Sequence, residues 1–340
     1  MREYPVHLKL EPPPLYFMHV PKTGGMALGQ WLRRVYGTGY FDLNLPQITK
    51  LTGHRIQDFR CYHAWHHGRS MLEWLGRSDL TVITMLRDPV ERVISAFKFH
   101  QRRAIEVPVN FKPEFLAMMR TVQHSRIEAC LEHELITHML SNGQVRLLGI
   151  RKDYAAFLAA VRRNRQEDAL LRPYDVPLLM DADDMPLLYA NAHAWLNKMP
   201  IVGLTERYPE SVLLVADLLG IPAPTEPPRA NVNPQRTDPA MRYRDQLAPE
   251  VVARLEELNR YDLELYAHAT ELFEHQWARY RAKPQRTYSI APRLRIPLRG
   301  AESRLKRWLR RTWPGLAQQV RLLRAKRRNR RTPNASQGQR

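Results

Sequence analysis

The sequence predicts a three-layer α/β fold in which a central parallel sheet is flanked by helices. Three stretches support this prediction, since each begins with an apolar run typical of a buried strand and continues with a helical pattern. These stretches are residues 15–36, 80–99 and 201–219. Strands that alternate with helices are typical of parallel sheets whose two faces are both covered.

The first stretch predicts an anion-binding loop between a strand and a helix. Residues 15–20 are apolar, and the apolar positions of 28–35 recur every three or four residues, as on one face of a helix. Between them, Gly24 and Gly25 let the backbone approach a ligand with its N–H groups. The helix N-terminus and Lys22 add positive charge. We therefore expect phosphate or sulfate to bind here; the alternative is an ordinary turn with a surface lysine.

The loop does not have the order of a Walker A motif. Lys22 precedes the two glycines, whereas the Walker lysine follows the last glycine and is itself followed by Ser or Thr. No obvious magnesium carboxylate follows a predicted strand. A P-loop kinase or NTPase is therefore disfavoured.

The second stretch predicts a basic residue at the start of a well-specified helix. Asp88 can cap that helix, Pro89 suits its first position and Glu91 completes an arrangement like a capping box. Arg87 ends the strand, where ligands bind in open parallel sheets, and its planar guanidinium suits a phosphate. The buried stripe of residues 90–97 is expected to leave the opposite face to Arg92, Ser95 and Phe99.

Both junctions resemble motifs of sulfotransferases that use 3′-phosphoadenylyl sulfate. Residues 19–25, H-V-P-K-T-G-G, resemble the 5′-phosphosulfate loop, and residues 87–97, R-D-P-V-E-R-V-I-S-A-F, resemble the 3′-phosphate motif. The similarity is closest to the bacterial and Golgi carbohydrate branch, which includes sulfotransferases of the heparan sulfate 2-O and 6-O type. It covers roughly residues 15–270.

The resemblance implies a P-loop-like fold, 3′-phosphoadenylyl sulfate as co-substrate, no metal, and a hydroxyl-bearing glycan, glycolipid-like or small-molecule acceptor. It assigns donor binding to Pro21, Lys22, Thr23, Gly24, Gly25, Met26, Ala27, Arg87 and Ser95. Lys22 would also stabilise the charge that develops as sulfur leaves the phosphate. Met26 and Ala27 replace two hydroxyl residues of the family pattern. The alternative is therefore a nucleotide-binding protein of the same fold with impaired catalysis.

A histidine-rich segment lies between the two motifs. In the resembling family, a G-H-x-x-x-G segment at this position carries the base that removes the acceptor's proton. His63 is the first candidate for this base, followed by His66 and His67, although Tyr62 stands where glycine is usual. A metal site is disfavoured because no Cys or carboxylate lies at ligand spacing. Each histidine has a structural role as its alternative.

Three later segments resemble the same family more weakly. Residues 142–148 match N-x-Q-x-R-x-L, although a structural turn explains them equally well. Thr205 and Glu206 follow a predicted strand and are expected near the ligand edge. Residues 259–266 match N-x-x-D-x-x-L-Y in a closing helix.

The charge divides the chain into a domain, 1–283, and a basic tail, 284–340. The tail has 17 Lys and Arg against the single Glu302, so it carries 16 of the net charge of +19. Its apolar positions among basic ones favour an anionic membrane surface. Nucleic acid or a polyanionic glycan would suit the same charges, and a solvated disordered extension is the remaining alternative. We expect no nucleic-acid partner for the domain.

Within the resembling branch, the absence of an N-terminal membrane anchor implies a bacterial cytoplasmic enzyme rather than a Golgi one, and we expect peripheral membrane contact through the tail. Residues 1–14 are too polar and proline-rich for a signal peptide, and no run of about 18 apolar residues occurs. The two cysteines, Cys61 and Cys130, lie far apart and form no metal or redox motif, as in a reducing compartment.

Overall fold

The computed structural model describes residues 11–43, 56–65, 67–102, 113–151, 153–156, 158–159, 184–230 and 241–283. The chain divides into two units, Met1–Gln285 and Arg286–Arg340, and every described residue belongs to the first. The predictions for His66 and for the basic tail therefore fall outside the described residues.

The described residues form one five-stranded parallel sheet in the order β2-β3-β1-β4-β5. The strands are β1 (Leu15–His19), β2 (Tyr40–Leu43), β3 (Cys61–Trp65), β4 (Thr81–Leu86) and β5 (Ile201–Leu204). The central strand, β1, pairs with β3 on one side and with β4 on the other, and all its residues are buried. Burial on both faces explains why its sequence is a continuous apolar run.

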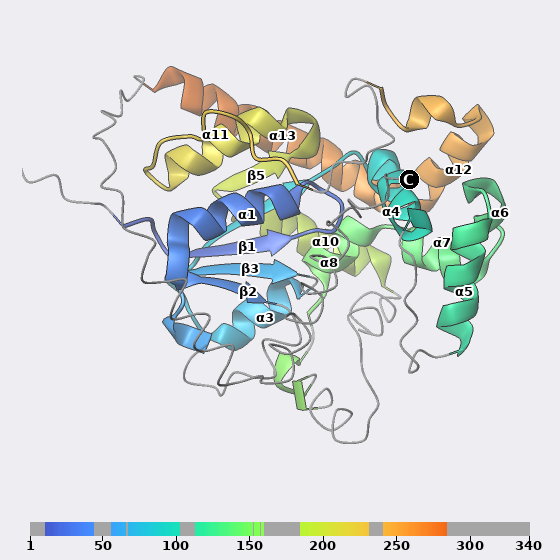
Figure 1. Ribbon diagram of the computed structural model, residues 1–340, viewed down its shortest axis with the longest axis horizontal. Helices are drawn as coiled ribbons and strands as arrows, with labels where there is room; N and C mark the ends of the chain where they lie inside the picture. Colours follow the sequence, from blue (N-terminus) through green and yellow to red (C-terminus); the bar gives the residue numbers. More distant parts are fainter. Residues whose placement is uncertain are drawn as a thin grey trace, which may run out of the picture. The chain divides into compact units, whose positions relative to one another are not determined.

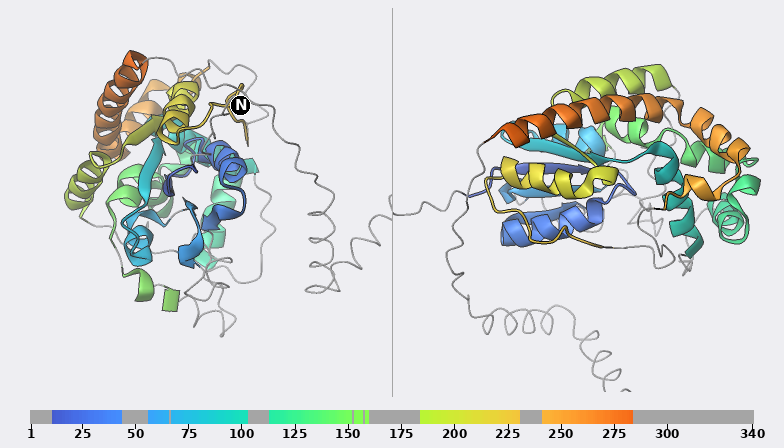
Figure 2. Two further views of the ribbon diagram at one scale, coloured as in Figure 1. Left: turned by 90° about the vertical axis from the view of Figure 1, so that its left-hand side faces the viewer. Right: turned by 90° about the horizontal axis from the view of Figure 1, so that it is seen from above.

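Helices cover both faces of this sheet, as predicted for a three-layer α/β fold. The helices are α1 (Gly25–Tyr36), α3 (Gly68–Leu75), α4 (Pro89–Arg102), α5 (Pro113–His124), α6 (Ile127–Cys130), α7 (Glu134–Leu140), α8 (Gly143–Gly149), α10 (Met185–Leu196), α11 (Tyr208–Leu218), α12 (Pro249–Leu258) and α13 (Arg260–Ala282). Figures 1 and 2 show α1 and α11 on one face and α3, α8, α10 and α13 on the other. None of the described helices has both the length and the apolar composition of a membrane span.

The parallel strands bring all their carboxyl ends to one edge of the sheet. In Figure 1 the arrowheads point toward the side on which α4 lies. Ligands bind at this edge in open parallel sheets. The predicted strands within 15–20, 80–86 and 201–207 are confirmed as β1, β4 and β5. In contrast, β2 and β3 fall in segments for which the sequence predicted no regular strand.

A second cluster of buried side chains lies beyond the sheet, among α4, α5, α6, α7 and α12. Three of these helices, α5, α6 and α7, follow one another along the chain between residues 113 and 140. Farther along the chain, α12 and α13 are two helices that meet at Asn259. The side-chain Oδ1 of Asn259 accepts a hydrogen bond from the N–H of Asn142 at 2.8 Å, so a long-range contact fixes the break.

The start of α4 is capped as predicted, whereas Arg92 on the same helix is not exposed as predicted. The N–H of Glu91 donates to Asp88 Oδ1 at 3.0 Å, and Pro89 is the first helical residue. Arg92, predicted on the exposed face, is 6% exposed, and its guanidinium lies 3.6 Å from the carboxylate of Asp262. The prediction for Arg92 was wrong because α13 also packs against α4.

Candidate functional site

The loop between β1 and α1, residues 20–24, lies at the carboxyl edge of the sheet. Lys22 and Gly24 both adopt positive φ angles, 73° and 77°. The buried hydroxyl of Thr23 donates to the carbonyl of Val20 at 2.8 Å and closes the turn. Gly24 is the N-cap of α1 without a side-chain hydrogen bond to the helix, and the first turn contains no acidic residue. A helix start of this kind favours anions through its N–H groups and dipole.

Lys22 is held in a basic and aromatic environment. Its Nζ lies 4.3 Å from the centroid of the Phe99 ring on α4. Burial and, to a smaller extent, the positive charges of Arg87 and Arg102 together lower the pKa of Lys22 to about 8. Like charges gathered at a half-buried point are stabilised when an anion binds between them.

The second predicted junction meets the first. Arg87 directly follows β4, its side chain is 9% exposed, and its Nη1 donates to the carbonyl of Lys22 at 3.3 Å. Its Nη2 donates to Glu91 Oε2 at 3.3 Å. Its buried Nε has no hydrogen-bond partner among the described residues and lies 3.8 Å from Glu206 Oε1. A buried donor without a partner is costly, and a phosphate oxygen would satisfy it.

The remaining predicted donor-binding residues lie along these two junctions. Thr23, Gly25 and Ala27 are buried, whereas Pro21, Gly24 and Met26 are partly exposed. Ser95, also partly exposed, precedes Phe99 by one turn of α4, so it shares the face that Lys22 contacts. The structure therefore brings the loop 20–27 and the start of α4 to one place.

His63 lies within β3 and beneath α1. It is 2% exposed, its Nε2 lies 2.8 Å from His19 Nδ1, and its Nδ1 lies 2.7 Å from the Tyr40 hydroxyl and 3.4 Å from Asp42 Oδ1. Burial lowers its pKa against the opposing effect of Asp42, which favours a neutral imidazole. A base must come within hydrogen-bond distance of the acceptor's proton. Direct contact would require these packed side chains to move, and the role of base stays a prediction.

Two glycines of α1 make room for this pair of histidines. A Cβ on Gly25 would lie 2.2 Å from the His19 ring, and one on Gly29 would lie 2.5 Å from the His63 ring. The two glycines are one helical turn apart and face the same way. They allow the start of α1 to pack directly on two stacked imidazoles whose centroids are 4.8 Å apart.

The third candidate histidine has a structural setting. His67 is 3% exposed, and its Nδ1 lies 2.9 Å from the hydroxyl of Tyr154. Among the residues that the structure describes, no three His, Cys, Asp or Glu side chains are grouped as metal ligands.

Thr205 and Glu206, which follow β5, lie at the carboxyl edge of the sheet, where they were expected. The Thr205 hydroxyl donates to the carbonyl of Leu86 at 2.9 Å. Glu206 accepts from the N–H of Asp88 at 3.2 Å and from the hydroxyl of Tyr266 at 2.7 Å, and burial raises its pKa. Both residues therefore tie β5 to the junction that carries Arg87.

Sequence reasoning missed two contacts of Arg87. The ring of Tyr243 lies 5.7 Å from the guanidinium, and no motif around Tyr243 signalled this contact. The side-chain amide of Gln144 holds the backbone of Arg87 by two hydrogen bonds. The sequence did contain a signal for Gln144, because residues 142–148 resemble a family motif. A structural turn explained that motif equally well.

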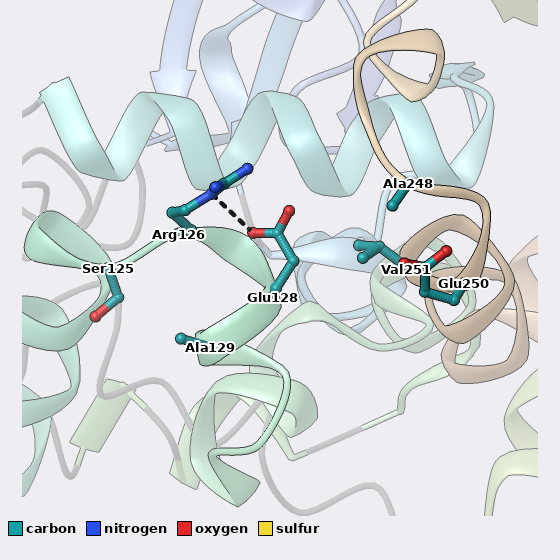
Figure 3. Close-up of a pocket in the computed structure, with 7 residues that line it drawn as sticks. All are labelled: Ser125, Arg126, Glu128, Ala129, Ala248, Glu250 and Val251. Carbon is teal, nitrogen blue, oxygen red and sulfur yellow. Dashed lines mark ion pairs between the residues drawn. The ribbon is translucent and has the colours of Figure 1, made fainter.

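A separate hollow of about 460 Å³ lies between the start of α6 and the start of α12 (Figure 3). It is lined by Ser125, Arg126, Glu128, Ala129, Ala248, Glu250 and Val251. An ion pair of 3.6 Å joins Arg126 and Glu128 on one side of it. None of the predicted anion-binding residues lines this hollow, so it is distinct from the candidate site.

The fold and the site define an α/β protein with a P-loop-like sheet that carries a basic, glycine-containing loop at its carboxyl edge. The model of the Sulfotransferase family matches residues 11–269, and the chain belongs to this family.

One curated relative shares a short region with the chain. A protein-tyrosine sulfotransferase from Arabidopsis thaliana is 30% identical over 99 residues, which is 28% of this chain and 18% of that protein. The chain therefore matches a small part of that relative's length.

Replacing Gly29 tests how closely α1 packs on His63. Gly29→Ala should lower the free energy of unfolding by about 1–3 kcal/mol, because the new methyl group would overlap the buried His63 ring. Urea unfolding measures this change. Gly39→Ala is the control, since its Cβ would meet Arg60 at an ordinary 3.5 Å. Equal stability of the two variants would contradict the packing described.

Proposed function

We propose that this sulfotransferase moves the sulfuryl group of 3′-phosphoadenylyl sulfate to a hydroxyl of a carbohydrate or glycolipid-like acceptor. The observation that carries the proposal is the meeting of Lys22 and Arg87, which come from separate strand-to-helix junctions and lie at one edge of the sheet. A donor with a phosphosulfate at one end and a 3′-phosphate at the other needs two such cationic anchors.

The residues present fit this donor. The loop 20–27 and the start of α1 would hold the 5′-phosphosulfate, while Arg87 and Ser95 would hold the 3′-phosphate. The Arg87 Nε, buried and without a hydrogen-bond partner among the described residues, supports this assignment. So do the mutually repelling charges of Lys22 and Arg87, which an anion would stabilise.

In this proposal Lys22 stabilises the transition state. The acceptor oxygen bonds to sulfur as the bond between sulfur and the bridging phosphate oxygen breaks, so negative charge grows on that oxygen. A fixed ammonium and oriented N–H groups lower the energy of this charge. The acceptor proton passes to a base, for which His63 is the proposed residue and His66 and His67 are the alternatives.

Two acceptor classes remain to be compared. The resemblance of the two motifs to carbohydrate sulfotransferases favours a glycan, and the name of the plant relative adds a tyrosine hydroxyl as the second candidate. Transfer of labelled sulfate onto a cell extract, followed by separate recovery of glycans and of proteins, would distinguish them. Label in sulfotyrosine alone would overturn the carbohydrate proposal.

A catalytically impaired nucleotide-binding protein is the alternative, because Met26 and Ala27 supply no hydroxyl groups to the loop. Measuring adenosine 3′,5′-bisphosphate binding together with sulfate transfer separates the two. The sulfotransferase proposal predicts both, whereas the alternative predicts binding without transfer. Absence of binding would contradict both.

Lys22→Ala should abolish sulfate transfer and leave the fold intact, because it removes the ammonium from the proposed position of charge development. Transfer rates and circular dichroism measure these two effects. Lys198→Ala, at an exposed lysine after α10, is the control and should keep normal activity. Retention of most activity by Lys22→Ala would exclude Lys22 from the mechanism.

The pKa of Lys22, about 8, predicts a pH dependence of donor binding. Below this pH the ammonium is charged and binds the anion; above it the free protein loses the charge. Affinity for adenosine 3′,5′-bisphosphate should therefore be constant near pH 7 and fall as pH rises beyond about 8. Calorimetry from pH 7 to 10 measures the curve. Lys22→Arg, which stays charged, should flatten it, and a flat wild-type curve would contradict the prediction.

A further inference from the structure

We propose that Gln144 is a positioning residue of the donor site, which acts by fixing the backbone of Arg87 and is itself held by Asp262 on α13. The inference rests on the proposed function, because its readout is donor binding. It gives the segment 142–148 and the closing helix a role at the site although neither is placed to contact the donor in the proposal above.

The side chain of Gln144 holds both backbone groups of Arg87. Its Oε1 accepts from the N–H of Arg87 at 3.0 Å, and its Nε2 donates to the carbonyl of Arg87 at 2.9 Å. Gln144 is fully buried, so water does not compete for these bonds. These two hydrogen bonds hold the backbone of Arg87, the first residue after β4, in the way that a neighbouring strand would. The point from which the guanidinium projects is thereby fixed.

Gln144 is in turn fixed by a buried carboxylate. Asp262 accepts from the N–H of Gln144 at 3.1 Å and from the N–H of Val145 at 2.7 Å. These two N–H groups belong to the first turn of α8, where a carboxylate is most favourable. Arg92, 3.6 Å from the same carboxylate, compensates its charge. Asp262 therefore sets the position of the helix start from which Gln144 reaches Arg87.

Two asparagines lock the same two segments together. The N–H of Asn142 donates to Asn259 Oδ1 at 2.8 Å, and Asn142 Oδ1 accepts from the N–H groups of Tyr261 and Asp262, both at 3.1 Å. The side-chain oxygen of each asparagine thus accepts hydrogen bonds from backbone N–H groups of the other segment. Asn142 adopts a positive φ of 46°, which asparagine tolerates better than most residues. This reciprocal arrangement leaves α8 little freedom to shift relative to α13.

The experiment compares Gln144→Ala with a matched buried glutamine. Gln276, 6% exposed, accepts from the N–H of Val202 at 3.1 Å and so also holds strand backbone, but on β5. Both substitutions remove buried hydrogen bonds and should lower the melting temperature. Affinity for adenosine 3′,5′-bisphosphate, measured by calorimetry on the full chain, should fall about tenfold for Gln144→Ala and stay unchanged for Gln276→Ala.

A double-mutant cycle shows whether Gln144 acts through Arg87. In an Arg87→Ala background, which still has the loop around Lys22 for the 5′-phosphate, Gln144→Ala should cause no further loss of affinity. Normal affinity in Gln144→Ala, or an equal loss with and without Arg87, would overturn the proposal. Lack of binding by the wild-type protein would instead overturn the proposed function itself.

A more conservative variant covers the case in which Gln144→Ala does not fold. Gln144→Glu keeps an acceptor for the N–H of Arg87 and, when ionised, loses the donor to its carbonyl. It should weaken the bisphosphate about threefold, again only when Arg87 is present. In a transfer assay the loss should appear in KM for the donor more than in kcat. A loss confined to kcat would contradict a role in positioning the donor-binding arginine.

Discussion

Parallel pairing between β1 and β4 is the constraint on which the site depends. Met18 pairs with Thr84, and the Thr84 hydroxyl also donates to the carbonyl of Met18 at 2.8 Å. Both strands then end at the same edge of the sheet, so that the turn around Lys22 and the residue Arg87 emerge side by side. Without this register, two basic residues 65 positions apart could not come into contact as Arg87 and Lys22 do.

The positive charge of Arg87 at this edge is balanced by carboxylates from several elements. Glu91, on α4, accepts from the Arg87 guanidinium with one oxygen and from the N–H of Arg244 with the other, at 3.3 and 3.0 Å. Glu206 approaches Arg87 from the end of β5. A buried charge needs such partners to avoid a large desolvation cost, and fixed partners also pre-organise it for a ligand. The Arg87 guanidinium is thereby restrained by the protein's own groups.

The sequence predicted the parts of the site whose structure depends on near neighbours. The turn at Gly24, the cap from Asp88 to the N–H of Glu91 and the start of α4 at Pro89 all involve residues within a few positions of one another. Such local interactions leave a pattern of residue types that can be interpreted without knowledge of the fold. The position of Arg87 at the end of a strand was predictable for the same reason.

Residues whose environment is set by distant segments were not predictable in this way. Arg92 has the spacing of an exposed helical position, yet its partner Asp262 comes from α13. His63 was the first candidate for a catalytic base, yet β3 lies between β1 and β2 and places this residue, buried, beneath α1. Periodicity within one segment contains no information about which other element will cover it.

The amino-acid sequence by itself determined the two strand-to-helix junctions and the basic residues that they present, because short-range sterics, capping and glycine conformations decide them. Only the tertiary structure decided which side chains meet. Gln144 reaches Arg87 across 57 residues, and Asp262 reaches Val145 across 117. These contacts form because burial requires each polar group to find a partner, and the partner that it finds depends on how the helices pack on the sheet.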